Sequence, residues 1–242
     1  MALVNTKGIV LRTMKYRETS LICDIFTREL GMRSYLVQGV RKKKSRIGAG
    51  FFQPMQVLDL VVYENPGSSL NRIKEVNASA LFLELQSNIP KSAVGLFIAE
   101  LARKSVRESS PNEELYDFLE QMLGYLEHTN ESLQLLPFWM GMKMTHYLGF
   151  SPNRPDQSDD SMYFDLRDGV LVNSKPYHPD IVTPPMALSF VELADAQLSD
   201  LANMNFSRQD RDLLFDKMID YYKLHIEHLG RLKTPEIFRE LF

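Results

Sequence analysis

Residues 31–54 read GMRSYLVQGVRKKKSRIGAGFFQP, and this stretch decides how the N-terminal part of the chain folds. It contains an alternating strand, a glycine, a six-residue run with five cations, and a Gly-Ala-Gly sequence before the next strand. The cations repel one another and have no neighbouring acid, so the pattern predicts a basic hairpin tip that a polyanion such as nucleic acid would neutralise. An ordinary solvated loop could carry the same charges, so the run alone leaves both interpretations open. The five cations are Arg41, Lys42, Lys43, Lys44 and Arg46.

The sequence around this run predicts a small β-barrel. No helical segment long enough for a crossover separates the predicted strands, so they are expected to pair as a five-stranded antiparallel barrel. The OB-fold is the leading candidate, because it closes its edges and offers one face and flexible loops to single-stranded nucleic acid. The predicted strands cover residues 3–14, 21–27, 32–38, 53–63 and 70–76.

Further residues of the predicted barrel are candidates for the same nucleic-acid site. Alternation in the first strand predicts that Val10 and Arg12 share a face, with more cations clustered at the end of that strand. In the third strand an aromatic residue shares a face with a cation, and its ring is a candidate platform for base stacking. The alternative is that this ring is packed in the barrel or covered. The candidates are Arg12, Lys15, Arg17, Arg33 and Tyr35.

Charge is distributed unevenly along the chain, whose net charge is −3. Residues 1–80 hold 13 Lys and Arg against 6 Asp and Glu, a balance of +7. The other residues hold 15 cations and 25 acids, a balance of −10. The N-terminal part is therefore expected to bind an anion, and the rest is not.

After Ala78 the hydrophobic period changes from two residues to about three and a half, which predicts helices. Residues 133–148 are apolar nearly all round, so this helix is expected at the buried centre of a second domain. The predicted domains are residues 1–80 and 81–242, with an irregular insert at about 151–185 that holds a small hairpin at Asp168-Gly169. Capping boxes predict helix starts at Ser110 with Glu113 and at Ser207 with Asp210.

The sequence favours a binding protein over an enzyme. Cys23 is the only cysteine, so it can form no intrachain disulfide and is expected to be a buried small hydrophobe. His225 and His228 are three residues apart, but no acid or cysteine lies at a matching offset for a shared metal. No serine–histidine–aspartate elbow or catalytic pair of carboxylates stands out. With no uncharged run long enough to span a bilayer and no signal peptide, the chain is expected in the cytoplasm.

Two N-terminal stretches carry a recognisable pattern: KGIVLRTMKYRETSLICDIFTRELGMRSYLVQGVRKKKSR (residues 7–46), with Tyr16-x-Glu18, and FFQPMQVLDLVVY (residues 51–63), with the Gln53-Pro54 strand opening. They resemble the start of the bacterial RecO family of recombination mediators. The helical part matches mainly in layout, best at Leu148-Gly149-Phe150-Ser151-Pro152. Many family members carry a four-cysteine zinc site in the insert. This chain has no cysteine there, so no zinc or other cofactor is expected.

The resemblance implies an OB domain followed by a helical domain, and a role in recombinational repair. It implies binding of single- and double-stranded DNA, annealing of complementary strands coated by single-stranded DNA-binding protein, and action with RecR to load a recombinase. The expected location is the nucleoid in the cytoplasm. Two hypotheses of other classes remain: an OB-fold protein adaptor with little direct nucleic-acid binding, and a metal-dependent hydrolase that uses the histidines.

The resemblance also implies that the helical domain grips the acidic C-terminal tail of single-stranded DNA-binding protein. An acidic domain attracts an acidic tail poorly, so a local apolar pocket with a few cations at its rim is expected. Each of these cations could instead be an ordinary solvated helix charge. The candidates for the rim are Arg103, Lys104, Arg107 and Lys143.

Overall fold

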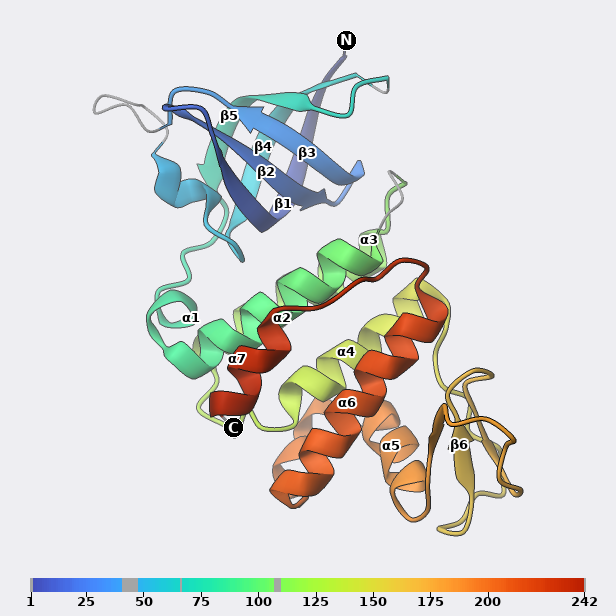
Figure 1. Ribbon diagram of the computed structural model, residues 1–242. Coiled ribbons are helices and arrows are strands. Elements are labelled where there is room, and N and C mark those ends of the chain that lie inside the picture. The colour runs from blue at the N-terminus through green and yellow to red at the C-terminus, as the bar shows by residue number, and fades with distance from the viewer. Residues whose placement is uncertain (1, 41–47, 66, 107–109, 242) are drawn as a thin grey trace. The chain divides into compact units, whose positions relative to one another are not determined.

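The computed structural model describes residues 2–40, 48–65, 67–106 and 110–241. Contacts within the chain divide it into two compact units, residues 1–129 and 130–242. The first unit holds a barrel and three helices, and the second holds the remaining helices and a small sheet (Figure 1). Within the described ranges, no helix is both long enough and apolar enough to cross a membrane.

The N-terminal strands close into a five-stranded barrel in the order β1-β2-β3-β5-β4, with β4 pairing back onto β1. Four of the pairings are antiparallel, and the pairing of β3 with β5 is parallel. The predicted architecture, an OB-type barrel followed by helices, is confirmed, except that β3 and β5 pair in parallel where an antiparallel barrel was predicted. The strands are β1 (Ala2–Tyr16), β2 (Ser20–Thr27), β3 (Gly31–Val37), β4 (Val57–Glu64) and β5 (Asn71–Ala78).

Alternate side chains of these strands fill the barrel. Val10, Ile25 and Leu58 are buried there, and Cys23 is the buried hydrophobe that its position predicted. A short 3₁₀ helix, η1 (Ala49–Phe52), precedes strand β4. The strand begins later than predicted, at Val57, because residues 53–55 form a turn in which Met55 has a left-handed backbone at φ 73°. Phe52 at the end of η1 is fully buried and closes one part of the core.

Helices α2 (Ile89–Ser105) and α3 (Glu113–His128) belong to the first unit, with the short α1 (Glu84–Ser87) before them. The Phe26 ring of β2 lies 6.0 Å from the Tyr116 ring of α3, and both residues are fully buried. The Lys7 ammonium lies 3.0 Å from a Glu120 carboxylate oxygen of the same helix. Helix α2 packs against β1, and α3 contacts the outer wall of the barrel through Tyr116 and Glu120.

The start of α3 differs from the prediction. The N-cap is Asn112, whose side-chain oxygen accepts a hydrogen bond from the Leu115 backbone N–H at 3.0 Å. Asparagine is as good a cap as serine, and here it lies two residues closer to the apolar run. The predicted cap at Ser110 is therefore wrong. The predicted capping box of Ser207 and Asp210 is confirmed at the start of α6 (Arg208–His225).

The second unit is built around α4 (Leu136–Leu148), which is buried over most of its length as predicted. Tyr222 of α6 donates a hydrogen bond to the Gly141 carbonyl oxygen of α4 at 2.6 Å. The predicted hairpin at Asp168-Gly169 is also confirmed, with Gly169 in the left-handed region at φ 67°. The other elements are β6 (Tyr163–Asp165), β7 (Val170–Val172), β8 (Ile181–Val182), α5 (Met186–Asp195), η2 (Leu198–Asn203) and α7 (Thr234–Leu241).

Candidate nucleic-acid interface

A β-bulge at Leu11 decides which way Arg12 points. Val10 pairs with Ile25 and Arg12 pairs with Asp24, so Leu11 is an extra residue without a partner on β2. Val10 consequently belongs to the barrel core, whereas Arg12 lies outside it beside Asp24. The prediction that Val10 and Arg12 share a face is wrong, because it assumed an unbroken two-residue period.

Arg12 is held in place by a carboxylate that is almost buried. Its Nε donates to Asp24 Oδ2 at 2.7 Å, and Ser34 Oγ donates to the other carboxylate oxygen at 2.8 Å. The Asp24 side chain is 10% exposed and that of Arg12 is 41% exposed. A guanidinium carries five N–H donors, so the exposed side of Arg12 can still donate to another acceptor. The arrangement orients Arg12 while partly neutralising its charge.

Lys15 and Arg17 lie at the exposed end of β1, where residues 17–19 turn the chain into β2. Arg17 has a left-handed backbone at φ 56°, and its guanidinium carbon lies 5.3 Å from the centre of the Tyr16 ring. Neither cation forms an ion pair within the described part of the chain. In OB folds the loop between the first two strands contacts the ligand. Lys15 and Arg17 therefore carry positive charge that is available at a position suited to binding.

Arg33 and Tyr35 lie on one face of β3, as predicted, but this face turns toward the barrel interior. Tyr35 is fully buried, and burial raises the pKa of its hydroxyl. Arg33 forms an ion pair with Glu64 at 3.3 Å, and their side chains are only 15% and 11% exposed. Tyr35 thus cannot present its ring to a base in this structure, and the positive charge of Arg33 is neutralised by Glu64. The structure therefore contradicts the predictions that Tyr35 stacks on a base and that Arg33 contacts nucleic acid.

The five cations of residues 41–46 lie outside the described residues, so their part in the site stays a prediction. The structure does show what bounds this segment. Val40 on one side and Phe52 on the other are both buried in the barrel core. Thr13 of β1 donates a hydrogen bond to the Phe52 carbonyl oxygen. The basic sequence is therefore inserted between two positions that are fixed by the barrel.

The four cations predicted for a partner-binding rim do not form one group. Lys104 of α2 pairs with Glu100 at 3.7 Å, and Arg103 precedes it in the same turn of the first unit. Lys143 belongs to the second unit, where it donates to the Asp195 carbonyl oxygen at 3.1 Å and lies over the Trp139 ring. Burial lowers the pKa of Lys143. Arg107 lies outside the described residues.

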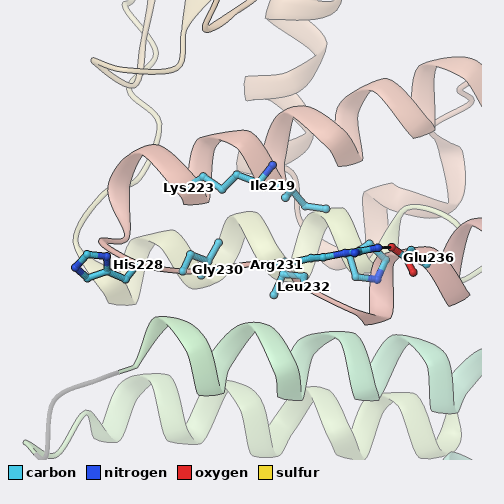
Figure 2. Close-up of a pocket in the computed structure, with 9 residues that line it drawn as sticks. Ile219, Lys223, His228, Gly230, Arg231, Leu232 and Glu236 are labelled. Carbon is cyan, nitrogen blue, oxygen red and sulfur yellow. Dashed lines mark hydrogen bonds and ion pairs between the residues drawn. The ribbon is translucent and has the colours of Figure 1, made fainter.

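A pocket of about 550 Å³ lies in the second unit, between α6 and the segment that follows it (Figure 2). Of the predicted rim cations that the structure describes, none lines it. Sequence reasoning missed it because no motif marks the residues after α6 that fold back beside that helix. Lys223 pairs with Asp220 at 2.9 Å, and Arg231 pairs with Glu236 across the end of the pocket. Apolar surface beside cations suits an acidic peptide with apolar side chains. The lining residues are Ile219, Lys223, His228, Leu229, Gly230, Arg231, Leu232, Pro235 and Glu236.

The histidines and acids of the described residues form no group of three or more that could hold a metal ion. The Nε2 atom of His225 lies 2.9 Å from the Leu166 carbonyl oxygen, and its ring stacks on Phe150 at 5.2 Å. The Nε2 atom of His178 lies 3.1 Å from a carboxylate oxygen of Asp165 in the insert. These contacts give both histidines structural partners. That the protein needs no zinc stays a prediction.

Comparison with known proteins gives matches over nearly the whole chain. Residues 1–82 match the family model described as Recombination protein O N terminal, and residues 86–235 match Recombination protein O C terminal. A protein of Phocaeicola vulgatus named DNA repair protein RecO is 32% identical over 240 residues, covering 99% of each chain. Proteins of the same name from Bacteroides fragilis and Flavobacterium psychrophilum are each 29% identical, again over 99% of both chains.

Proposed function

The chain belongs to the RecO family of DNA repair proteins, and from this premise we propose that it is a DNA-binding recombination mediator. It binds single- and double-stranded DNA through the cations of its barrel and has no catalytic activity or metal requirement of its own. Its place of action is the bacterial nucleoid. The observation that carries the proposal is the pair of exposed cations, Lys15 and Arg17, at the β1–β2 turn of an OB-type barrel.

Cations that hold phosphates give affinity without sequence information, which suits a protein that must act anywhere on a chromosome. Arg12 adds an oriented guanidinium on the same strand, three residues and about 10 Å from Lys15. The basic residues 41–46 lie in the sequence between Val40 and Phe52, which are both buried in the barrel core. We infer that these groups together form the DNA site.

We further propose that the protein anneals complementary strands coated by single-stranded DNA-binding protein and acts with RecR to load the recombinase. Annealing of coated strands requires a grip on the coating protein as well as on DNA. The pocket between α6 and Leu232 supports binding of this protein, because it has apolar walls and two cations, Lys223 and Arg231. An acidic tail would take the place of Asp220 and Glu236, which pair with these cations in the structure. We therefore transfer the predicted tail site from Arg103, Lys104, Arg107 and Lys143 to this pocket.

The second candidate is an OB-fold adaptor that binds proteins and touches nucleic acid weakly. The barrel fold alone does not decide between the two, because OB folds bind proteins as well as nucleic acids. The exposed cations favour DNA binding. A direct binding measurement separates the two.

The experiment is fluorescence anisotropy with a labelled oligonucleotide at several salt concentrations. The double variant K15A/R17A is compared with R72A/K74A, which removes two exposed cations from β5 of the same barrel. Each lost single-strand phosphate contact reduces the slope of log affinity against log salt by about 0.7. We expect a loss of up to about 1.4 for K15A/R17A and little change for R72A/K74A. Absence of DNA binding by the unaltered protein at low salt would favour the adaptor.

Tail binding is tested separately, with a peptide of the acidic C-terminal tail. Charge reversal at Lys42, Lys43 and Lys44 should abolish annealing of bare strands and leave peptide binding unchanged. The variant L232E places a carboxylate in the pocket wall, where Leu232 is 6% exposed, and should abolish peptide binding while DNA binding persists. Loss of peptide binding in the folded triple variant would mean that the barrel holds both sites.

A further inference from the structure

Arg103 is a half-buried cation for which the described residues supply no hydrogen bond or ion pair. It lies in the last turn of α2, a helix that packs against β1. Other half-buried cations of this unit are paired, as Arg33 is with Glu64 and Lys104 with Glu100. Withdrawing a cation from water without a partner is costly, and an anionic ligand that reaches the exposed part of Arg103 would lower this cost.

The charges that act on Arg103 come from β1 and β2 as well as from its own helix. Burial lowers its pKa most, the nearby Arg12 lowers it further, and the carboxylates of Asp24 and Glu100 oppose both effects. Asp24 already accepts from Arg12 at 2.7 Å, and Glu100 already pairs with Lys104. Helix α2 packs against β1, which brings the charges of Arg103 and Arg12 near each other, and the two nearby carboxylates already pair with Arg12 and with Lys104.

We propose that Arg103 and Arg12 together bind one phosphate of the DNA backbone, so that the interface continues from β1 onto helix α2. This inference rests on the proposed function. A phosphate between the two guanidinium groups would remove their mutual repulsion and satisfy the donors that Asp24 leaves free on Arg12. Guanidinium groups suit this ligand because their planar donors match two phosphate oxygens at once. Arg103 is accordingly a DNA contact and not part of the rim of a protein pocket.

The alternative explanation is a stabilising role, since a cation in the last turn interacts favourably with the helix dipole. The two roles predict opposite effects on stability. Removing a cation that is half-buried, unpaired and beside another cation leaves the melting temperature unchanged or raises it. Removing a cation that stabilises the helix lowers it.

The test compares R103A with K74A, which removes an exposed cation of β5 whose ion pair is with its sequence neighbour Glu75. Both are titrated with a labelled oligo-dT over a salt series and melted by circular dichroism. For R103A we expect weaker binding, a salt slope smaller by at most about 0.7 because Arg12 still contacts the phosphate, and an undiminished melting temperature. For K74A we expect no change in affinity or slope. R103K should keep the charge contribution to the slope but bind less tightly, because it lacks the planar fork.

Unchanged affinity and slope for R103A, in a preparation whose parent protein binds DNA, would overturn the inference and leave the proposed function standing. If the parent protein itself fails to bind DNA, the proposed function fails. A double-mutant cycle tests whether the phosphate is shared: losses from R12A and R103A should be less than additive, whereas losses from K15A and R103A should add. Additive losses for Arg12 and Arg103 would show that the two side chains contact different phosphates.

Discussion

The Asp24 carboxylate offers a perturbation whose effects on DNA binding and on stability should have opposite signs. The variant D24N keeps the size of the side chain and an oxygen that can accept from Ser34 or Arg12. It removes the negative charge that partly neutralises Arg12 and acts on Arg103. We expect tighter DNA binding and a less stable barrel.

The expected magnitudes follow from the geometry. A phosphate on the free side of the Arg12 guanidinium would lie about two hydrogen-bond lengths, about 6 Å, from the Asp24 carboxylate. Two unit charges at about that distance in water interact by about 0.7 kcal/mol, so removing one should strengthen binding about threefold at low salt. A hydrogen bond to a charged group contributes about 1.5–3 kcal/mol to folding, and the 41% exposure of Arg12 lowers this to about 1–2 kcal/mol.

The assay is anisotropy at low salt, together with urea unfolding followed by far-ultraviolet circular dichroism. Tryptophan fluorescence would miss the barrel, because Trp139 is the only tryptophan and lies in the second unit. The matched control is E64Q, which removes the same charge from the barrel beside Arg33. Arg33 stays inside the barrel, so DNA affinity should not rise. Weaker binding by D24N would refute the reasoning, because it would mean that Asp24 matters by positioning Arg12 and not by neutralising it.

Three further predictions concern other parts of the molecule. Alanine at all five cations of residues 41–46 should flatten the salt slope by at most about 3.5, and an unchanged slope would remove this segment from the site. The purified protein should contain no metal, and stoichiometric zinc that survives dialysis would contradict this. The variant F26A should lower the free energy of unfolding by about 3–5 kcal/mol, because Phe26 is fully buried between the barrel and Tyr116; a loss below about 1 kcal/mol by urea unfolding would mean that α3 is not held there.

Alternation of residue types was enough to predict the strands, the barrel and the helical second part. It could not tell which face of β3 is the inner one, because a two-residue period fixes which residues share a face but not where that face points. Tyr35 was therefore a reasonable stacking candidate in the sequence and is a core residue in the structure. Glu64, which pairs with Arg33, comes from β4, and only the strand order of the closed barrel brings the two together.

The direction in which Arg12 points was predicted wrongly for a different reason. A single extra residue at Leu11 reverses the alternation that follows it, and nothing in the local sequence marks the bulge. The closeness of Arg103 to the barrel cations could not be predicted, because Asp24 and Arg12 belong to strands about 80 and 90 residues earlier in the chain. The start of α6 was predicted from its capping box at Ser207, and the start of α3 was missed because a second capping residue, Asn112, lies nearer the helix. A capping box expected at Ser189 with Glu192 does not form, because α5 already begins at Met186.

The contact of α2 and α3 with the barrel wall also determines where the chain can be divided. A protein that ended near residue 80 would expose Phe26, Ile9 and Leu11 to water, all of which are buried in the intact chain. Such a fragment should aggregate or bind other molecules through this apolar wall, and its apparent interactions would be artefacts of the truncation. A fragment ending at Thr129 keeps α3 and its ion pairs with Lys7 and Arg28. A fragment for studying the barrel should therefore extend to Thr129, beyond residues 1–82 that match the N-terminal family model.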